Sequence, residues 1–412
     1  MLSWLLYFEA TLQKGVVTVK KLLFVIWLFT GLIILVTSQG FAEDTKMEME
    51  GLKTRVEELE KRGERQEEGS KGILGVIAEK ISFSGGVELD FSYADDSDTG
   101  DNTDDSDTGD NTVNDPTSDM QIGTVELGAE IKLHEYVTGN LLLKGENLDS
   151  EDKVSWDEAT ITIRKEGFPL YFVGGKRGQP FGVFESHLIN DPITKECYEI
   201  ARTGATLGFT PDILGLDASF TVYRGEILAG KLYNAGVGLT RSTSSTYFAT
   251  DDVSSYIGNI AVSPVEGLTL AIFYDSEPGD GDRNETVGGM FNLQIWKLTF
   301  DAEYMKAISR EKNFTDDKAY KESAWFGAVA LQVAEPLELA ARYEGFDDDR
   351  DANQDGTLKN RYSIGANYTL FKKDNFSTTI MAEYRRSNYE KASGSAYDDK
   401  LDEFFVRLAI AF

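Results

Sequence analysis

From Ile81 to the end of the chain, apolar and polar side chains alternate with a period of two. In the first such segment, Val87 and Leu89 share one face, whereas Glu88 and Asp90 share the other. Because successive side chains of a β-strand point to opposite faces, this pattern predicts a strand with one apolar and one polar face. Similar segments recur throughout, and no stretch with helical periodicity separates them.

The connections between these segments alternate between short turns and long polar loops. The short turns lie near residues 134–135, 165–169, 210–215, 264–267, 296–297, 335–336 and 372–375, and the long loops span 94–119, 148–155, 178–200, 225–253, 276–285, 307–322, 347–359 and 387–400. Such asymmetry is typical of outer-membrane barrels, and about seven turns with about eight loops give about 16 strands. The predicted fold class is therefore all-β, a transmembrane antiparallel β-barrel.

The final segment favours a membrane barrel over a soluble β-sandwich or propeller, whose strands would also alternate. One face of this segment carries Phe404, Val406, Leu408, Ile410 and Phe412. A last amphipathic strand that ends in Phe is similar to the signal by which the barrel assembly machinery takes up outer-membrane proteins. Since lipid offers no water to backbone amides and carbonyls, strands can cross it only as a closed sheet.

The N-terminal residues have the pattern of an export signal. Two lysines precede an apolar run over residues 22–36, and small residues lead to a cleavage site after Ala42. A signal peptide over residues 1–42 is predicted, because a membrane anchor, the alternative, needs ~20 apolar residues. The extension upstream of the lysines is unusually long, so we expect the natural start to lie later than Met1.

A short heptad pattern follows this signal. Within residues 43–72, apolar side chains recur at alternating spacings of three and four, at Met49, Leu52, Val56 and Leu59. This predicts a coiled-coil helix of about two heptads. A periplasmic stalk, which would trimerise or contact the envelope, and a solvated helix across the barrel mouth are both consistent with it. Residues 73–412 then form the barrel.

Composition excludes several classes of function. The chain has 41 Lys+Arg against 70 Asp+Glu, a formal charge of -29, so nucleic acid is a poor partner. With Cys197 as its only cysteine and two histidines, it lacks the residues for a disulfide framework or a thiolate metal cluster. Ser186 beside His187 is the only candidate catalytic group, and we predict no enzyme.

The polar faces of the strands carry charges of both signs. Their basic members include Lys144, Arg164, Arg342, Arg385 and Arg407. A lumen lined by both signs is water-filled or plugged by its own loops. For any single residue, the simpler interpretation is that it hydrates the wall and pairs with a neighbour.

The segment GGKRGQPFGVFESHLINDPITKE differs from the other loops. Lys176 and Arg177 bring adjacent cations close to Phe181 and Phe184, and the segment is long enough to fold inward and narrow the pore. It could then select anions or chelates by charge and aromatic contact. The alternative is an ordinary surface loop.

Two acidic stretches lie in predicted extracellular loops. Residues 95–112 hold a tandem repeat without apolar side chains, which predicts a solvated loop. Asp351, Asn353 and Asp355, with the carbonyl of Thr357, match the opening of a calcium loop, but the closing Glu is missing. The sequence therefore allows either a Ca²⁺ site or an acidic turn there, and no other cofactor is predicted.

The chain resembles the LbtU-type siderophore porins, the family named for a legiobactin receptor. The resemblance rests on the short coiled coil, ISFSGGVELDFSY, the GGKRGQPFGVFESHLINDPITKE segment and the terminal Phe412. It implies an outer-membrane porin that carries ferric siderophore. For the grip on the chelate we hypothesise Lys176, Arg177 and Arg202.

Transport by such a protein would be passive or driven by downstream capture. Energised iron receptors are ~22-stranded barrels with a plug domain, whereas only about 38 residues separate Ala42 from Ile81. A general or anion-selective diffusion porin and a structural envelope protein tethered through its coiled coil are the alternatives. Barrel size and heptads both favour association, and a homotrimer is one expectation.

Overall fold

The computed structural model describes residues 80–95, 116–146, 148, 153–234, 251–279, 281–312, 317–350, 357–391 and 400–412. The predicted signal peptide, the coiled-coil stalk, nearly all of the acidic repeat and Asp351, Asn353 and Asp355 of the predicted calcium loop lie outside these residues.

The described residues form sixteen strands. They are β1 (Ile81–Asp95), β2 (Thr117–His134), β3 (Val137–Glu146), β4 (Val154–Arg164), β5 (Leu170–Gly178), β6 (Ala201–Phe209), β7 (Asp217–Tyr223), β8 (Ser255–Val265), β9 (Leu268–Glu277), β10 (Asn284–Ile295), β11 (Leu298–Ser309), β12 (Ser323–Ala334), β13 (Leu337–Asp347), β14 (Leu358–Lys373), β15 (Phe376–Tyr389) and β16 (Lys400–Ala411). The predicted alternation of short turns and long loops is confirmed.

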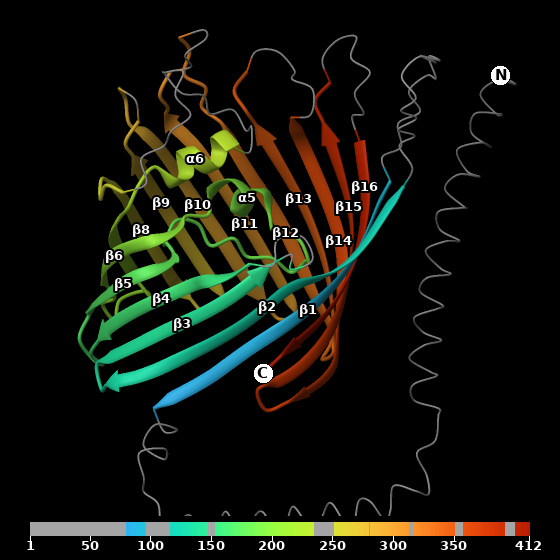
Figure 1. Ribbon diagram of the computed structural model, residues 1–412, viewed down its shortest axis with the longest axis horizontal. Coiled ribbons are helices and arrows are strands. Elements are labelled where there is room, and N and C mark those ends of the chain that lie inside the picture. Colours follow the sequence, from blue (N-terminus) through green and yellow to red (C-terminus); the bar gives the residue numbers. More distant parts are fainter. Residues whose placement is uncertain are drawn as a thin grey trace, which may run out of the picture. The chain divides into compact units, whose positions relative to one another are not determined.

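Each strand pairs antiparallel with its neighbour in the sequence, and β1 also pairs with β16 (Figure 1). The sheet is therefore a closed barrel, as the sequence predicted. At the seam, the backbone amides of Gly85 and Phe412 each donate to the other's carbonyl at 3.0 Å. A Cβ at Gly85 would lie 2.7 Å from the Phe412 ring, so the glycine makes room for the terminal aromatic side chain.

The outer face of the barrel is apolar, with aromatic side chains toward both ends. Exposed aromatic residues toward the long loops include Trp156, Phe220, Tyr304, Trp325 and Tyr343, and those toward the short turns include Phe83, Phe168, Phe209, Trp296, Phe371 and Phe412. Two such bands around an aliphatic belt are typical of barrels whose wall meets lipid. Among the described residues, no helix has the length and apolar character to cross a membrane.

Helices α5 (Ile193–Tyr198) and α6 (Ile227–Asn234) lie within long loops of the described part of the chain, which differs from the expectation of no helical segment. Helix α5 lies between β5 and β6, and α6 lies between β7 and β8. At its start, α6 donates the backbone amides of Ile227, Leu228 and Ala229 to the Glu277 carboxylate at 2.8–2.9 Å. Because these donors are satisfied by a distant strand, the local sequence carries little sign of the helix.

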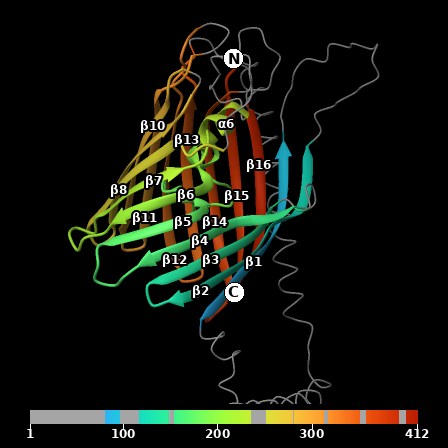
Figure 2. The same ribbon diagram turned by 60° about the vertical axis from the view of Figure 1, so that its left-hand side comes forward.

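An apolar core lies inside the barrel rather than between two layers. Side chains of both connections, among them Phe181, Tyr198 and Leu228, pack against inward-facing side chains such as Phe273 and Met305. Phe181 meets Phe273 edge-on with ring centroids 6.3 Å apart. Figures 1 and 2 show α6 near the loop end of the barrel. One side of the interior is therefore packed like a soluble protein core.

Candidate pore and the segment that narrows it

The connection from Gln179 to Ile200, which we call the inner segment, lies inside the barrel. Its backbone amides donate to carboxylates on three strands of the opposite wall: Val183 to Glu303 at 2.8 Å, Ile193 to Glu344 at 3.2 Å and Asn190 to Glu383 at 2.9 Å. Glu303 lies on β11, Glu344 on β13 and Glu383 on β15, so a surface course is excluded. The sequence allowed either a segment folded into the barrel or an ordinary surface loop, and the structure shows the segment folded into the barrel.

Arg342 on β13 holds the middle of the inner segment. Its Nη1 donates to Ser186 Oγ at 3.0 Å and to the Asn190 carbonyl at 2.9 Å, and its Nη2 donates to the Asp191 carbonyl at 3.1 Å. Its Nε lies 2.8 Å from Glu344 Oε2, and the residue is 3% exposed. Arg342 thus faces the interior as predicted, but its guanidinium is taken up by the segment and is not presented to solvent.

His187 attaches the middle of the inner segment to the inner wall of the barrel through two carboxylates. Its Nε2 lies 3.0 Å from Asp301 Oδ2, and its Nδ1 lies 3.2 Å from Glu338 Oε1. These hydrogen bonds, that to Asp301 first, raise the pKa of His187 to about 10. His187 is therefore a cation held between two carboxylates. Ser186 Oγ instead bonds the backbone carbonyls of Leu188 and Asn190, so the structure does not bring the two side chains of the candidate catalytic group together.

Helix α6 extends the packed side of the interior. Lys231 Nζ donates to the carbonyls of Lys195 and Glu199 at 2.9 and 3.3 Å, at the C-terminal end of α5. Burial lowers the pKa of Lys231. The carbonyl of Lys195 also accepts the backbone amide of Glu199 at 3.2 Å, and a cation is favourable at this end of the helix dipole. The β5–β6 and β7–β8 connections therefore pack as one unit.

The remaining inner wall, formed by β16 and β1–β6, keeps its charges partly exposed. On the seam, Arg407 pairs with Asp90 at 2.7 Å and Glu88 at 3.0 Å, and its side chain is 20% exposed. At the border of this wall, Glu403 of β16 pairs at 2.7 Å with Arg385 of the neighbouring strand β15. These predicted lumen residues face the interior, and their charges are balanced by neighbours.

Arg177 and Arg202 differ from these pairs. They are direct register partners on β5 and β6 and point to the same, inward face. Arg177 Nη2 donates to Thr206 Oγ1 at 2.9 Å, and no carboxylate of the described residues lies within 4.0 Å of either guanidinium. Like charges directly opposite each other are destabilising. An anion between them would offset that repulsion.

Two predicted pore residues lie elsewhere. Lys176 shares the face of Phe172 and Ile161, which are exposed on the outer wall, and its Nζ bonds the Trp156 carbonyl. Strand parity sends it outward while its neighbour Arg177 points inward. Phe181 is fully buried in the core, so it presents no ring to a solute. The structure does not bring either residue to the lumen surface.

The other candidates have separate places. Phe184 has a positive φ of 58° and is partly buried against the core. Arg164, near the short turns, donates to Thr210 Oγ1 at 3.3 Å, and Lys144 pairs with Glu146 at 2.8 Å. The carbonyl of Thr357, the described member of the predicted calcium loop, accepts the amide of Glu390 at 2.7 Å.

Sequence reasoning missed the acidic residues of β11 that receive the inner segment. Asp301 and Glu303 are 4% and 3% exposed, whereas Phe300 and Tyr304 beside them are exposed on the outer face. The alternation in this strand places both carboxylates inward. The two carboxylates on the inward face of this strand were the sequence signal that could have indicated a site for an inward-folded loop.

Comparisons with known proteins agree on the barrel. Neither a protein-family model nor a curated protein matches the chain. Among solved structures, the anion-selective porin from Comamonas acidovorans has 12% identity and a TM-score of 0.54, and it covers 81% of this chain and 99% of its own. The Salmonella typhi OmpF complex with daunomycin has 13% identity and a TM-score of 0.55, with coverage of 81% and 97%.

A third neighbour is OmpT of Vibrio cholerae in its trimer form. It has 10% identity and a TM-score of 0.51 and covers 81% of this chain and 99% of its own. At these identities the likeness establishes the fold, a sixteen-stranded porin barrel. The resemblance to LbtU-type siderophore porins finds no support in these matches.

Proposed function

We propose that the chain forms an outer-membrane channel of the porin type. Small solutes would pass between the inner segment and the open inner wall of β16 and β1–β6. The observation that carries this proposal is the one-sided filling of the interior, in which carboxylates of β11, β13 and β15 are covered while Arg407 and Lys144 stay partly exposed. A closed barrel with a charged, partly exposed inner wall supports a water-filled conduit.

We propose a small anionic solute as cargo. Arg177 and Arg202 support this choice, because Arg385 and Arg407, two further inward-facing cations, already have carboxylate partners. A guanidinium pair can bind a carboxylate or phosphate with several directed hydrogen bonds. Ferric siderophore is the specific cargo that the family resemblance implies. A diffusion porin without siderophore preference is the nearest alternative.

Several expectations from the sequence remain part of the proposal. They are export by the N-terminal signal, insertion by the barrel assembly machinery, a periplasmic coiled coil and a homotrimer in the outer membrane of a Gram-negative-type bacterium. The trimer form of Vibrio cholerae OmpT supports the homotrimer by analogy of fold alone.

Planar bilayer recording tests the proposal. We expect single-channel steps from the purified chain, and in a KCl gradient we expect a reversal potential that indicates anion preference. A reversible fall in current on addition of a ferric chelate would support the siderophore cargo. Conductance without such a block would favour a diffusion porin, and an inserted barrel that conducts no ions would be a structural protein and would overturn the channel.

A further inference from the structure

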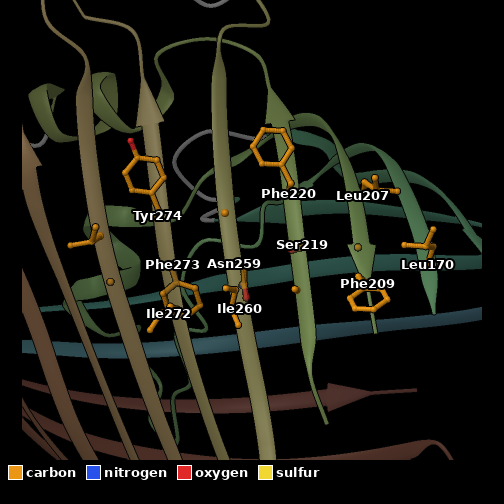
Figure 3. Close-up of a pocket in the computed structure, with 15 residues that line it drawn as sticks. Leu170, Leu207, Phe209, Ser219, Phe220, Asn259, Ile260, Ile272, Phe273 and Tyr274 are labelled. Carbon is orange, nitrogen blue, oxygen red and sulfur yellow. The ribbon is translucent and has the colours of Figure 1, made fainter. Parts of the chain in front are cut away.

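The outer wall of the barrel has a hollow on the side away from the lumen. It has a volume of about 720 Å³ and spans strands β5–β10. Exposed apolar side chains surround it: Leu207, Phe209, Phe220, Ile260 and Ile272. In Figure 3, Phe220 and Tyr274 lie toward the loop ends of their strands and Phe209, Ile260 and Ile272 lie further toward the turns.

A glycine creates the depth of this hollow. Gly258 on β8 is in register with Tyr274 and lies two residues from Ile260, so it belongs to the outward face. A Cβ built on Gly258 would meet no atom within 4 Å, and its backbone is not in the left-handed region. The position therefore has no conformational need for glycine. The space over Gly258 is open because glycine has no side chain, and a larger residue at this position would fill it.

The loop end of the hollow is aromatic and charged. Tyr256 lies between Phe220 and Tyr274, with ring centroids 6.2 Å from each. The guanidinium of Arg283 stacks over the Tyr256 ring at 4.8 Å and is oriented by its Nε, which donates to Ser276 Oγ at 2.7 Å. The hollow is thus apolar along its length and cationic at one end.

A carboxylate also lies at this end. Glu285 Oε1 accepts the hydroxyl of Tyr274 at 2.7 Å, which occupies one of its oxygens. The aromatic row therefore separates the apolar hollow from a pair of opposite charges. This order, from apolar through aromatic to charged, is that of the hydrocarbon, interface and headgroup layers of a membrane.

We propose that this hollow binds one acyl chain of a phosphorylated membrane lipid, with the lipid phosphate at Arg283. The chain would lie over Gly258 between Phe220 and Ile272. The proposal rests on the membrane location in the proposed function, but it concerns the outer wall and not the pore. Because lipid tails are themselves apolar, the advantage of this site comes from packing into a fitted surface. Charge complementarity at Arg283 selects a lipid over a second copy of the chain.

Spin-labelled lipids test this site. The full chain is reconstituted in phosphatidylcholine vesicles that contain spin-labelled phosphatidylglycerol, or a spin-labelled diacylglycerol that lacks the phosphate. Electron paramagnetic resonance then measures the motionally restricted lipid. We expect Gly258→Leu to lower the restricted fraction by about one lipid per barrel, because one site is filled. Arg283→Gln should remove the preference for phosphatidylglycerol over diacylglycerol.

Ala366→Leu is the matched control. Ala366 faces outward on β14 as the register partner of the exposed Leu339, so the variant adds the same side chain elsewhere on the outer wall. It should leave the restricted fraction unchanged. An equal fraction in wild type and Gly258→Leu overturns the site, as does a Gly258→Leu variant that loses chain-to-chain cross-links instead of lipid.

Conductance separates this inference from the proposed function. Gly258→Leu should conduct as the wild type does, which also shows that the variant folds. Loss of lipid from a barrel that conducts no ions would support the lipid site and refute the channel. A chain that does not enter vesicles overturns both.

Discussion

The two halves of the inner wall follow the same alternation but have opposite surroundings. On β11 and β13, the inward Glu303, Arg342 and Glu344 are at most 3% exposed, since the inner segment covers them. On β16 and β3, the side chains of Arg407 and Lys144 are 20% and 28% exposed. Strand parity therefore decides which face a charge occupies, whereas a loop from across the barrel decides whether that charge is structural or available to a solute.

The largest effect should come from removing a charge in the covered half. Arg342→Met leaves the carbonyls of Asn190 and Asp191 without their donor, and Glu344 keeps Arg361 at 3.0 Å as its partner. Each buried carbonyl that is left without its donor costs about 1–3 kcal/mol. We expect the inner segment to detach, with larger and noisier single-channel currents and a lower unfolding temperature on heated gels. Wild-type currents from this variant would show that Arg342 does not hold the segment.

Charge reversal in the open half should change selectivity rather than stability. In the double variant Arg177→Glu and Arg202→Glu, we expect the reversal potential in a KCl gradient to move toward cation preference, because both groups face the lumen. Lys176→Glu is the matched control, since it reverses the adjacent charge on the outer face. An equal effect of Lys176→Glu and the double variant on the reversal potential would show that the inward orientation of Arg177 and Arg202 and the outward orientation of Lys176 are wrong.

The hold of His187 should depend on pH. Because the folded pKa of about 10 lies above the ordinary value of 6.5, its stabilisation is fully present below about pH 6.5 and is lost as pH rises toward 10. Wild-type current noise should therefore increase toward pH 10. The His187→Gln variant should show more current noise than the wild type at neutral pH. Its current noise should not show the rise toward pH 10 that comes from His187. Parallel pH profiles of the two proteins would exclude His187 as its origin.

The smallest effect is expected where an ion pair of the open wall is broken. Lys144→Met removes the partner of Glu146, whose side chain is 62% exposed, so the cost should stay below about 1 kcal/mol. Heated gels should place its unfolding temperature beside that of the wild type. A loss as large as that of Arg342→Met would mean that the open wall is not solvated.

Much of the barrel could be predicted from the sequence because every strand shows the same alternation of apolar and polar side chains. Strands, turns and the closing segment follow from the period of two and from turn residues. The same parity separates Lys176 from Arg177, although treating them as one cationic pair hid this difference. The burial of Phe181 against Phe273 and the capping of α6 by Glu277 could not be predicted, since each joins residues far apart in the chain.

The seam between β1 and β16 has a consequence for how the barrel is made. The Arg407–Asp90 ion pair joins residues 317 positions apart, so almost all of the strands must reach the membrane before this contact can form. Contacts of such separation form slowly, because the intervening chain must be ordered first. Closure is thus a late event in biogenesis, and until then both edge strands carry unpaired backbone groups with which a neighbouring chain can pair.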